Sequence, residues 1–125
     1  MKTIINTPNA PAPIGPYSQA VLVNGTLYAS GQIAINPETG ELILDSIEAE
    51  TTQVMANIKA VLQAANMDYS NIIKSSIFLS DMGSFAQVNE VYGRYFTADF
   101  PARETVEVAC LPKNVNVEIS VIAVA

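Results

Sequence analysis

The sequence predicts an α+β fold in which one mixed β-sheet carries two helices on one face. Three observations point to this fold. The 125 residues fit a single domain over residues 1–125. The predicted elements follow the order β-β-(β)-α-β-α-β-β, with only two segments at helical spacing. The last strand is apolar on both faces beyond Ser120, yet two helices can cover only one face of the sheet. We therefore expect the other face to meet a second copy of the chain.

The first forty residues predict an extended arm and a β-hairpin. Four prolines between Pro8 and Pro16 fix φ and remove amide donors, which favours an arm over a helix. Asn24-Gly25 is the strongest short signal for a two-residue turn, and the segments on either side are rich in β-formers. The predicted elements are an arm over residues 8–16, strands over 17–23, 26–30 and 32–35, and a turn over 36–40.

Two later segments predict helices. The first has apolar residues at i, i+3, i+4 and i+7 from Ile47 onward, with Asp45 or Ser46 as its N-cap and Asn66 as its stop. The second starts at Ser84, with a capping box to Gln87, and its apolar stripe continues to Phe96. The remaining strands are predicted over residues 72–79, 105–109 and 115–124.

The composition excludes several kinds of chemistry. Without histidine, the chain has no Ser-His-Asp or Cys-His catalysis and no His-ligated metal. The single cysteine, Cys110, allows no disulfide or cysteine-rich zinc site and is expected to be a small buried residue. A net charge of −6, with six scattered Lys and Arg residues, argues against nucleic acid as a partner. No signal peptide or membrane span is visible, so we expect a cytoplasmic protein without a membrane partner.

Two charged residues are candidates for a binding site. Arg103 follows Pro101-Ala102 and opens a strand, where its guanidinium can hold a carboxylate through two parallel bonds. The alternative is a surface ion pair with Glu104 or Glu107. Glu118 lies in an apolar strand, where burial raises the pKa of a carboxyl and suits it to act as a general base. The alternative is a structural salt bridge to Arg103 or a lysine.

Tyr17, Ser30 and Gly31 form a third, weaker group. Tyr17 follows two rigid residues, and Ser30-Gly31 interrupts a strand, where it can offer a hydroxyl and a close-approaching backbone. Side-chain packing for Tyr17 and a β-bulge at Ser30-Gly31 are the alternatives. Arg94, on the polar side of the second helix, is expected to be a solvated surface residue.

A series of short motifs runs through the whole chain. They are Ile14-Gly15-Pro16-Tyr17-Ser18-Gln19-Ala20, Ser30-Gly31-Gln32, Asn36-Pro37, Asn57-Ile58-Lys59-Ala60, Val88-Asn89, Tyr95-Phe96, Pro101-Ala102-Arg103, Leu111-Pro112-Lys113 and Val117-Glu118-Ile119. In this order they resemble the RidA family, also called YjgF or L-PSP. The resemblance implies a chorismate-mutase-like α+β fold, and a homotrimer whose three sheets form a central barrel with active sites between subunits.

The resemblance also implies an activity. Members of the family hydrolyse enamine and imine intermediates, chiefly 2-aminoacrylate/2-iminopropanoate and 2-iminobutanoate, to 2-keto acids and ammonia, without a cofactor or metal. These intermediates come from pyridoxal-phosphate dehydratases acting on serine and threonine. The residues that match the family site are Arg103 for the substrate carboxylate, Glu118 for the attacking water, Tyr17 for the pocket wall, and Ser30, Gly31 and Thr105 for ligand contacts.

The sequence departs from the family pattern at four positions: Glu104 replaces a small residue, Thr105 a frequent cysteine, Cys110 a basic residue and Ser120 a glutamate. Glu104 could compete with the substrate for Arg103. Because successive strand residues point to opposite faces, we expect Glu104 to point away from Arg103.

Two other functions remain as alternatives to the imine deaminase. A non-catalytic regulator would bind 2-keto or amino acids in the same pocket, and release of ammonia from 2-iminobutanoate separates it from the enzyme. A ribonuclease or translation inhibitor is disfavoured by the negative charge, the absence of histidine and the lack of a basic stripe.

Overall fold

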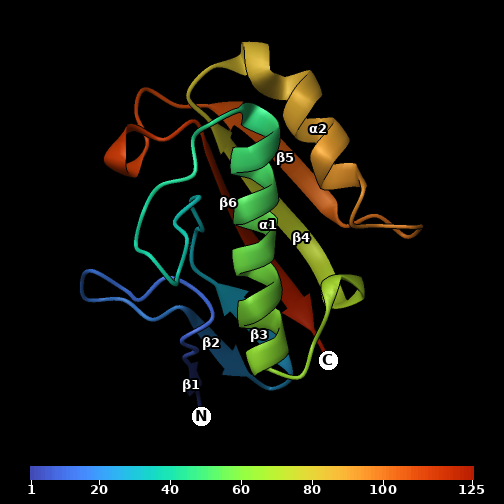
Figure 1. Cartoon of the computed structure of the whole chain (residues 1–125). Helices are drawn as coiled ribbons and strands as arrows, with labels where there is room; N and C mark the ends of the chain where they lie inside the picture. The colour runs from blue at the N-terminus through green and yellow to red at the C-terminus, as the bar shows by residue number, and fades with distance from the viewer.

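The computed structural model describes residues 1–125 and contains one six-stranded mixed sheet with both helices on the same face (Figure 1). The elements are β1 (Thr3–Ile5), β2 (Ala20–Val23), β3 (Thr26–Ala29), α1 (Ile47–Ala64), β4 (Ile72–Leu79), α2 (Phe85–Gly93), β5 (Ala102–Glu107) and β6 (Val117–Val124). The strand order is β1-β2-β3-β6-β4-β5, in which only β4 and β5 run parallel. The predicted α+β fold, with a mixed sheet and two helices, is confirmed.

The hairpin turn and the first helix lie where the sequence predicts. Asn24 (φ 51°) and Gly25 (φ 78°) adopt the left-handed backbone that a tight two-residue hairpin turn requires. The Oγ of Ser46 accepts a hydrogen bond from the backbone N–H of Ala49 at 3.0 Å and so caps α1. Asn66 (φ 59°) takes the left-handed conformation typical of a helix stop.

The second helix differs from its prediction at both ends. A 3-10 turn over Met82–Ser84 runs directly into α2, and Asp81 caps that turn. Ser84 consequently has a helical backbone and makes no capping bond, so the predicted capping box is wrong. The helix ends at Gly93, and Phe96 packs against the core from the turn beyond it.

Several strand boundaries also differ from the predictions. The short β1, which pairs with β2, was not predicted because three residues are too few to show alternation. The segment over 32–35 forms no continuous strand and makes only two isolated bridges, Gln32 to Ile119 and Ile35 to Leu42. β5 begins at Ala102 rather than at residue 105, because it pairs in parallel with β4 from Lys74 onward.

Cys110 is exposed, so the expectation of a buried residue is wrong. It lies in the turn region after β5, where its Sγ contacts Oδ1 of Asn114 at 3.2 Å. Burial was expected because no histidine or clustered base lies near Cys110 in the sequence, but the chain leaves the sheet before this position.

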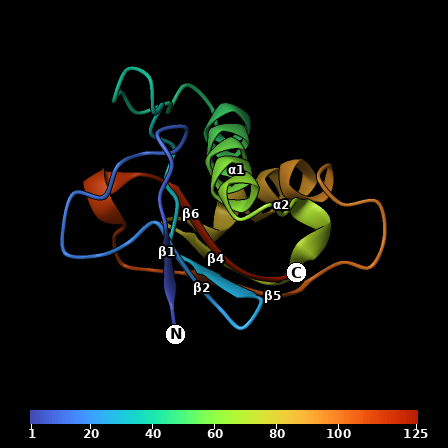
Figure 2. The same ribbon diagram turned by 90° about the horizontal axis from the view of Figure 1, so that it is seen from below.

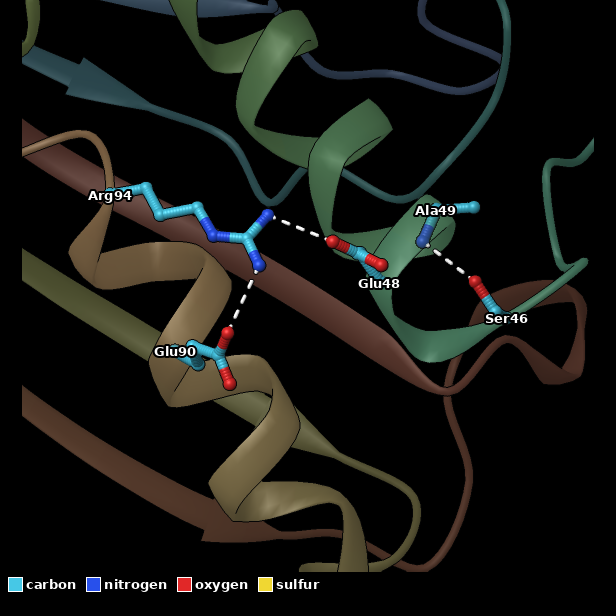
Figure 3. A network of polar contacts seen from close by, with 5 residues as sticks. All are labelled: Ser46, Glu48, Ala49, Glu90 and Arg94. Atoms are coloured by element: carbon cyan, nitrogen blue, oxygen red, sulfur yellow. Dashed lines mark hydrogen bonds and ion pairs between the residues drawn. The ribbon is translucent and has the colours of Figure 1, made fainter.

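Arg94 links the two helices at the surface (Figure 3). Its Nη1 donates to Oε2 of Glu48 on α1 at 2.9 Å, and its Nη2 donates to Oε1 of Glu90 on α2 at 3.1 Å. The side chain is exposed, as predicted, but it is held by two carboxylates rather than free in solvent.

The sheet has one covered and one uncovered face. The buried residues of β6 lie beneath the helices: Val117, Ile119, Val121 and Ala123. The alternate residues of β6 point to the opposite face, which no helix covers (Figure 2). Apolar side chains on that face stay accessible, among them Tyr28 at 50% and Val106 at 40% exposure. Cover by a second copy of the chain remains a prediction. Neither helix is long and apolar enough to cross a lipid bilayer.

Candidate functional site

One buried amide holds the N-terminal arm against the sheet. Gln19 is only 2% exposed. Its Oε1 accepts the N–H of Thr7 at 2.7 Å, and its Nε2 donates to the carbonyl oxygens of Thr7 and Pro11, each at 3.0 Å. The sequence identified Gln19 only as a member of a motif, because a buried glutamine has no distinguishing pattern. By fixing the arm, Gln19 also fixes the segment that carries Tyr17.

Four predicted site residues line a single cavity of about 480 Å³. Its walls come from the arm, the segment after β3, the turn before β6 and β6 itself. The predicted residues among its lining are Tyr17, Ser30, Gly31 and Glu118. The structure therefore brings together residues that the sequence identified separately.

Ser30 and Gly31 present different groups at this cavity. The Ser30 hydroxyl donates to the carbonyl oxygen of Ser18 at 2.6 Å. The backbone N–H of Ser30 donates to the carbonyl oxygen of Gln19 at 2.9 Å. These bonds hold the segment in place and use both Ser30 protons. The backbone N–H of the exposed Gly31 has no partner within the chain, so it is a free donor at the cavity.

The Glu118 carboxylate lies directly against Gly31. A Cβ at position 31 would come within 2.8 Å of the Glu118 Cδ and would overlap its Oε2, so the close approach requires glycine. The side chain makes no hydrogen bond, and no ion pair of the chain involves it. The alternative of a structural salt bridge is therefore wrong. Burial raises the pKa of the Glu118 carboxyl above its ordinary value.

Arg103 lies elsewhere, in a second cleft of about 500 Å³ beneath α2. Its Nη1 donates to Oδ1 of Asn89 at 2.7 Å. The guanidinium carbon lies 5.3 Å from the ring centre of Tyr92 and 5.7 Å from that of Phe85. Residues 85, 89 and 92 share one helical face, a spacing that could have identified Asn89 and Tyr92 as partners of this arginine.

The carboxylates next to Arg103 do not bind it. Glu104 points to the uncovered face, where it pairs with Nζ of Lys74 at 3.0 Å and accepts a hydrogen bond from the Ser76 hydroxyl. Glu107 accepts the backbone N–H of Met82 at 2.8 Å. The expectation that Glu104 points away is confirmed, and the alternative of an Arg103 ion pair with either glutamate is wrong.

Thr105 shares the helix-covered face of β5 with Arg103. Its hydroxyl oxygen is buried and has no hydrogen-bond partner in the chain. A buried hydroxyl without a partner is unusual, since such groups are nearly always satisfied. Thr105 therefore keeps an unused donor and acceptor on the same face of β5 as Arg103.

The predicted site residues thus fall into two groups on opposite faces of the sheet. β4 lies between β5 and β6, and its register pairs Ser75 with Arg103 but Phe78 with Glu118. Positions 75 and 78 are three residues apart and so point to opposite faces. Within one chain, Arg103 and Glu118 cannot act on the same small molecule.

A model of the family described as endoribonuclease L-PSP matches residues 7–125. The chain belongs to this family. The YjgF gene product of E. coli, another protein with this fold, has a solved structure that superposes with a TM-score of 0.93 at 46% identity and covers 98% of each chain. The family identification and the mixed-sheet fold thus agree with the resemblance seen in the sequence.

Two curated relatives of this L-PSP protein carry different functional names. The 2-iminobutanoate/2-iminopropanoate deaminase of Bos taurus is 47% identical over 124 residues, which are 99% of this chain and 90% of the relative. AldR of Lactococcus lactis, which bears the name of a regulator, is 53% identical over 120 residues, or 96% and 95% of the two chains. Both names bear on the function proposed below.

Proposed function

We propose that this L-PSP protein hydrolyses small 2-imino acids, such as 2-iminopropanoate and 2-iminobutanoate, to 2-keto acids and ammonia. The observation that carries the proposal is the state of Glu118. It is a half-buried carboxylate with no partner in the chain, placed in a cavity beside the free N–H of Gly31. The deaminase names of relatives 43–47% identical to this chain support the same reaction.

The reaction needs one water and one carboxylate. The water oxygen bonds to C2 of the imine while Glu118 accepts a proton from that water. Glu118 then passes the proton to the imine nitrogen, which gives a carbinolamine. The carbinolamine hydroxyl then loses its proton, which again reaches the nitrogen through the carboxylate. The C–N bond breaks, and ammonia leaves as the C2 carbonyl forms. A carboxyl whose pKa is raised by burial suits both proton transfers near neutral pH.

The substrate carboxylate requires a cation, and we assign this role to Arg103 of a neighbouring subunit. Arg103 lacks an ion-pair partner in its own chain and lies on the other face of the sheet from Glu118. A homotrimer, with its uncovered sheet faces turned inward, would bring the Arg103 cleft of one subunit to the Glu118 cavity of the next. The accessible apolar side chains on that face support such an assembly.

Release of ammonia tests the reaction, with a serine or threonine dehydratase generating the imine in the assay. Glu118→Gln should assemble and bind 2-oxobutanoate like the wild type but lose turnover by roughly 100-fold or more, as expected for loss of a general base. Unchanged turnover in Glu118→Gln would show that this carboxylate does not handle the water.

Calorimetric titration with 2-oxobutanoate tests the role of Arg103. Removing one partner of a desolvated charge pair costs about 2–5 kcal/mol, so Arg103→Ala should weaken binding by roughly 30-fold to several-thousand-fold. Arg103→Lys should recover only part of the affinity, since it lacks the bidentate geometry. Glu104→Ala is the matched control: Glu104 faces Lys74 on the other side of the strand, so binding should be nearly unchanged. Wild-type affinity in Arg103→Ala would refute the assignment.

A ligand-binding regulator is the second candidate, favoured by the name of AldR at 53% identity. A regulator would use the same two half-sites, the Arg103 cleft and the Glu118 cavity, without turnover. Binding of 2-oxobutanoate without ammonia release would identify it. The endoribonuclease description of the family has no comparable support here, because the chain has no histidine and a net charge of −6. RNA cleavage that persists in Arg103→Ala would revive that description.

A further inference from the structure

A buried carboxylate in the first turn of α1 makes contacts that the proposed reaction does not explain. Glu50 is 0% exposed and belongs to no ion pair. Its Oε2 accepts the backbone N–H groups of Asn116 at 2.7 Å and Val117 at 3.0 Å, and its Oε1 accepts Nδ2 of Asn116 at 2.8 Å. A buried carboxylate without a cation is costly unless hydrogen bonds satisfy it, so these three donors define its position closely.

The residues that Glu50 holds directly precede Glu118. Asn116 is also tied to the end of β4, where Ser80 donates its N–H to the Asn116 carbonyl oxygen at 3.1 Å and its hydroxyl to Oδ1 at 3.3 Å. Helix α1, strand β4 and the start of β6 therefore meet at one side chain. The backbone that carries Glu118 cannot rotate here without breaking bonds to Glu50.

The turn before this point is under backbone strain. Lys113 and Asn114 are consecutive non-glycine residues in the left-handed region, each with φ 56°. Such conformations persist only where the surrounding structure enforces them. Pro112 and Lys113 line the same cavity as Glu118. Loss of the anchor at Asn116 would let the turn relax, which would shift the cavity wall and the Glu118 carboxylate together.

We propose that Glu50 is a positioning residue for the imine site, acting through Asn116 and Val117 to hold Glu118 and the Pro112-Lys113 wall in place. The proposal rests on the proposed function.

The role should depend on the reach of the side chain rather than on its charge. In Glu50→Gln, Oε1 can still accept both backbone N–H groups, and Nε2 can donate to Oδ1 of Asn116 after that amide flips. The Nδ2 of Asn116 then faces the Ser80 hydroxyl, which can accept it. Glu50→Asp keeps the charge but is one methylene too short to reach these donors.

Kinetics of ammonia release by the full-length protein, paired with 2-oxobutanoate titration, test this role. Glu50→Asp and Glu50→Ala should lower kcat by at least about tenfold, while affinity for 2-oxobutanoate changes by less than about threefold because Arg103 governs it. Glu50→Gln should keep kcat within about threefold of wild type. Leu62→Ala, a core truncation on α1 away from Asn116, is the control for stability: it should lower the melting temperature but keep kcat per folded molecule.

Amide hydrogen exchange provides a measurement that does not depend on turnover. The N–H groups of Asn116 and Val117 should exchange at least about tenfold faster in Glu50→Asp and Glu50→Ala, and at the wild-type rate in Glu50→Gln. If the wild type releases no ammonia, the proposed function fails, and the exchange rates still decide whether Glu50 holds this segment. Faster exchange without a fall in kcat would overturn the positioning role. Failure of both Glu50→Asp and Glu50→Ala to fold would also overturn it, because Glu50 would then serve stability alone.

Discussion

The side chain of Glu118 occupies the space that a Cβ at position 31 would fill. The sequence indicated both residues, Gly31 as the interruption of a strand and Glu118 as a carboxylate in an apolar strand. It could not show that they touch, since no spacing rule connects two positions so far apart in the chain. Local sequence patterns do not predict contacts of this kind, between residues far apart in the chain.

Gly31→Ala should move the Glu118 carboxylate without unfolding the chain, because the overlapping atoms are at the end of a flexible side chain. We expect turnover to fall by at least about tenfold, through misplacement of the reacting group. The melting temperature should change little. The check is ammonia release beside thermal melts, repeated in a Glu118→Ala background, where Gly31→Ala should have no further effect. Full turnover in Gly31→Ala would contradict the placement of the carboxylate.

The raised pKa of Glu118 also predicts how stability depends on pH. Between the ordinary value of 4.5 and the higher folded value, the folded state holds the proton more tightly than the unfolded chain. Stability therefore falls as pH rises through this window. Glu118→Gln has no charge to desolvate, so it should melt above the wild type at neutral pH and converge with it below pH 4.5. A melting difference that is the same at all pH values would mean that the carboxylate is well solvated.

At the level of elements, the separation of Arg103 from Glu118 follows from the strand between them. Strand periodicity predicts which residues of β5 or of β6 share a face. It does not predict which residue of one strand lies beside which residue of another. The register of β4 against both neighbours sets that relation, and register depends on contacts across the sheet. The sequence therefore identified candidate residues, but it could not predict that the sheet would divide them between its two faces.

The ends of the helices also show that a sequence pattern predicts local contacts better than the arrangement of neighbouring segments. The start of α1 was predictable because its cap is local: Ser46 bonds to Ala49 three residues along. The start of α2 was not, because Asp81 caps a 3-10 turn that already leads into the helix and leaves Ser84 without a capping role.

Two serine variants test this difference. Ser46→Ala removes a hydrogen bond from an otherwise unpaired helical N–H and should lower the free energy of unfolding by about 1 kcal/mol. Ser84→Ala is the matched control, since Ser84 makes no capping bond, and should leave stability nearly unchanged. Denaturant titrations of both variants give the comparison, and equal losses would contradict the assignment of the caps.

The uncovered sheet face is the main feature at the scale of the whole molecule. Only 14% of the residues are charged, and the strand with two apolar faces predicted that something must cover the second face. The structure confirms that no helix does so (Figure 2). Which partner covers the face cannot be derived from one chain, because the packing lies between molecules.

A charge placed in the middle of this face should prevent assembly. Ile122 lies there, paired with Tyr28 on β3 and near Lys74 on β4. In Ile122→Lys the new ammonium would be buried beside a like charge, so the chain should stay folded but remain a monomer and lose turnover. Light scattering is the measurement, with a trimer of the 13.4 kDa chain expected for the wild type. Ala56→Lys, on the exposed side of α1, should leave the trimer intact. A monomeric wild type would contradict both the assembly and the shared site.

The placement of Arg103 and Glu118 on opposite faces has a genetic consequence. When each site takes its cation from one subunit and its carboxylate from the next, two inactive alleles can complement each other. Co-expressed Arg103→Ala and Glu118→Gln chains that mix at random would regenerate roughly one intact site in four, although neither chain alone forms any. A cell that carries both damaged alleles would therefore regain part of the activity that either allele alone abolishes.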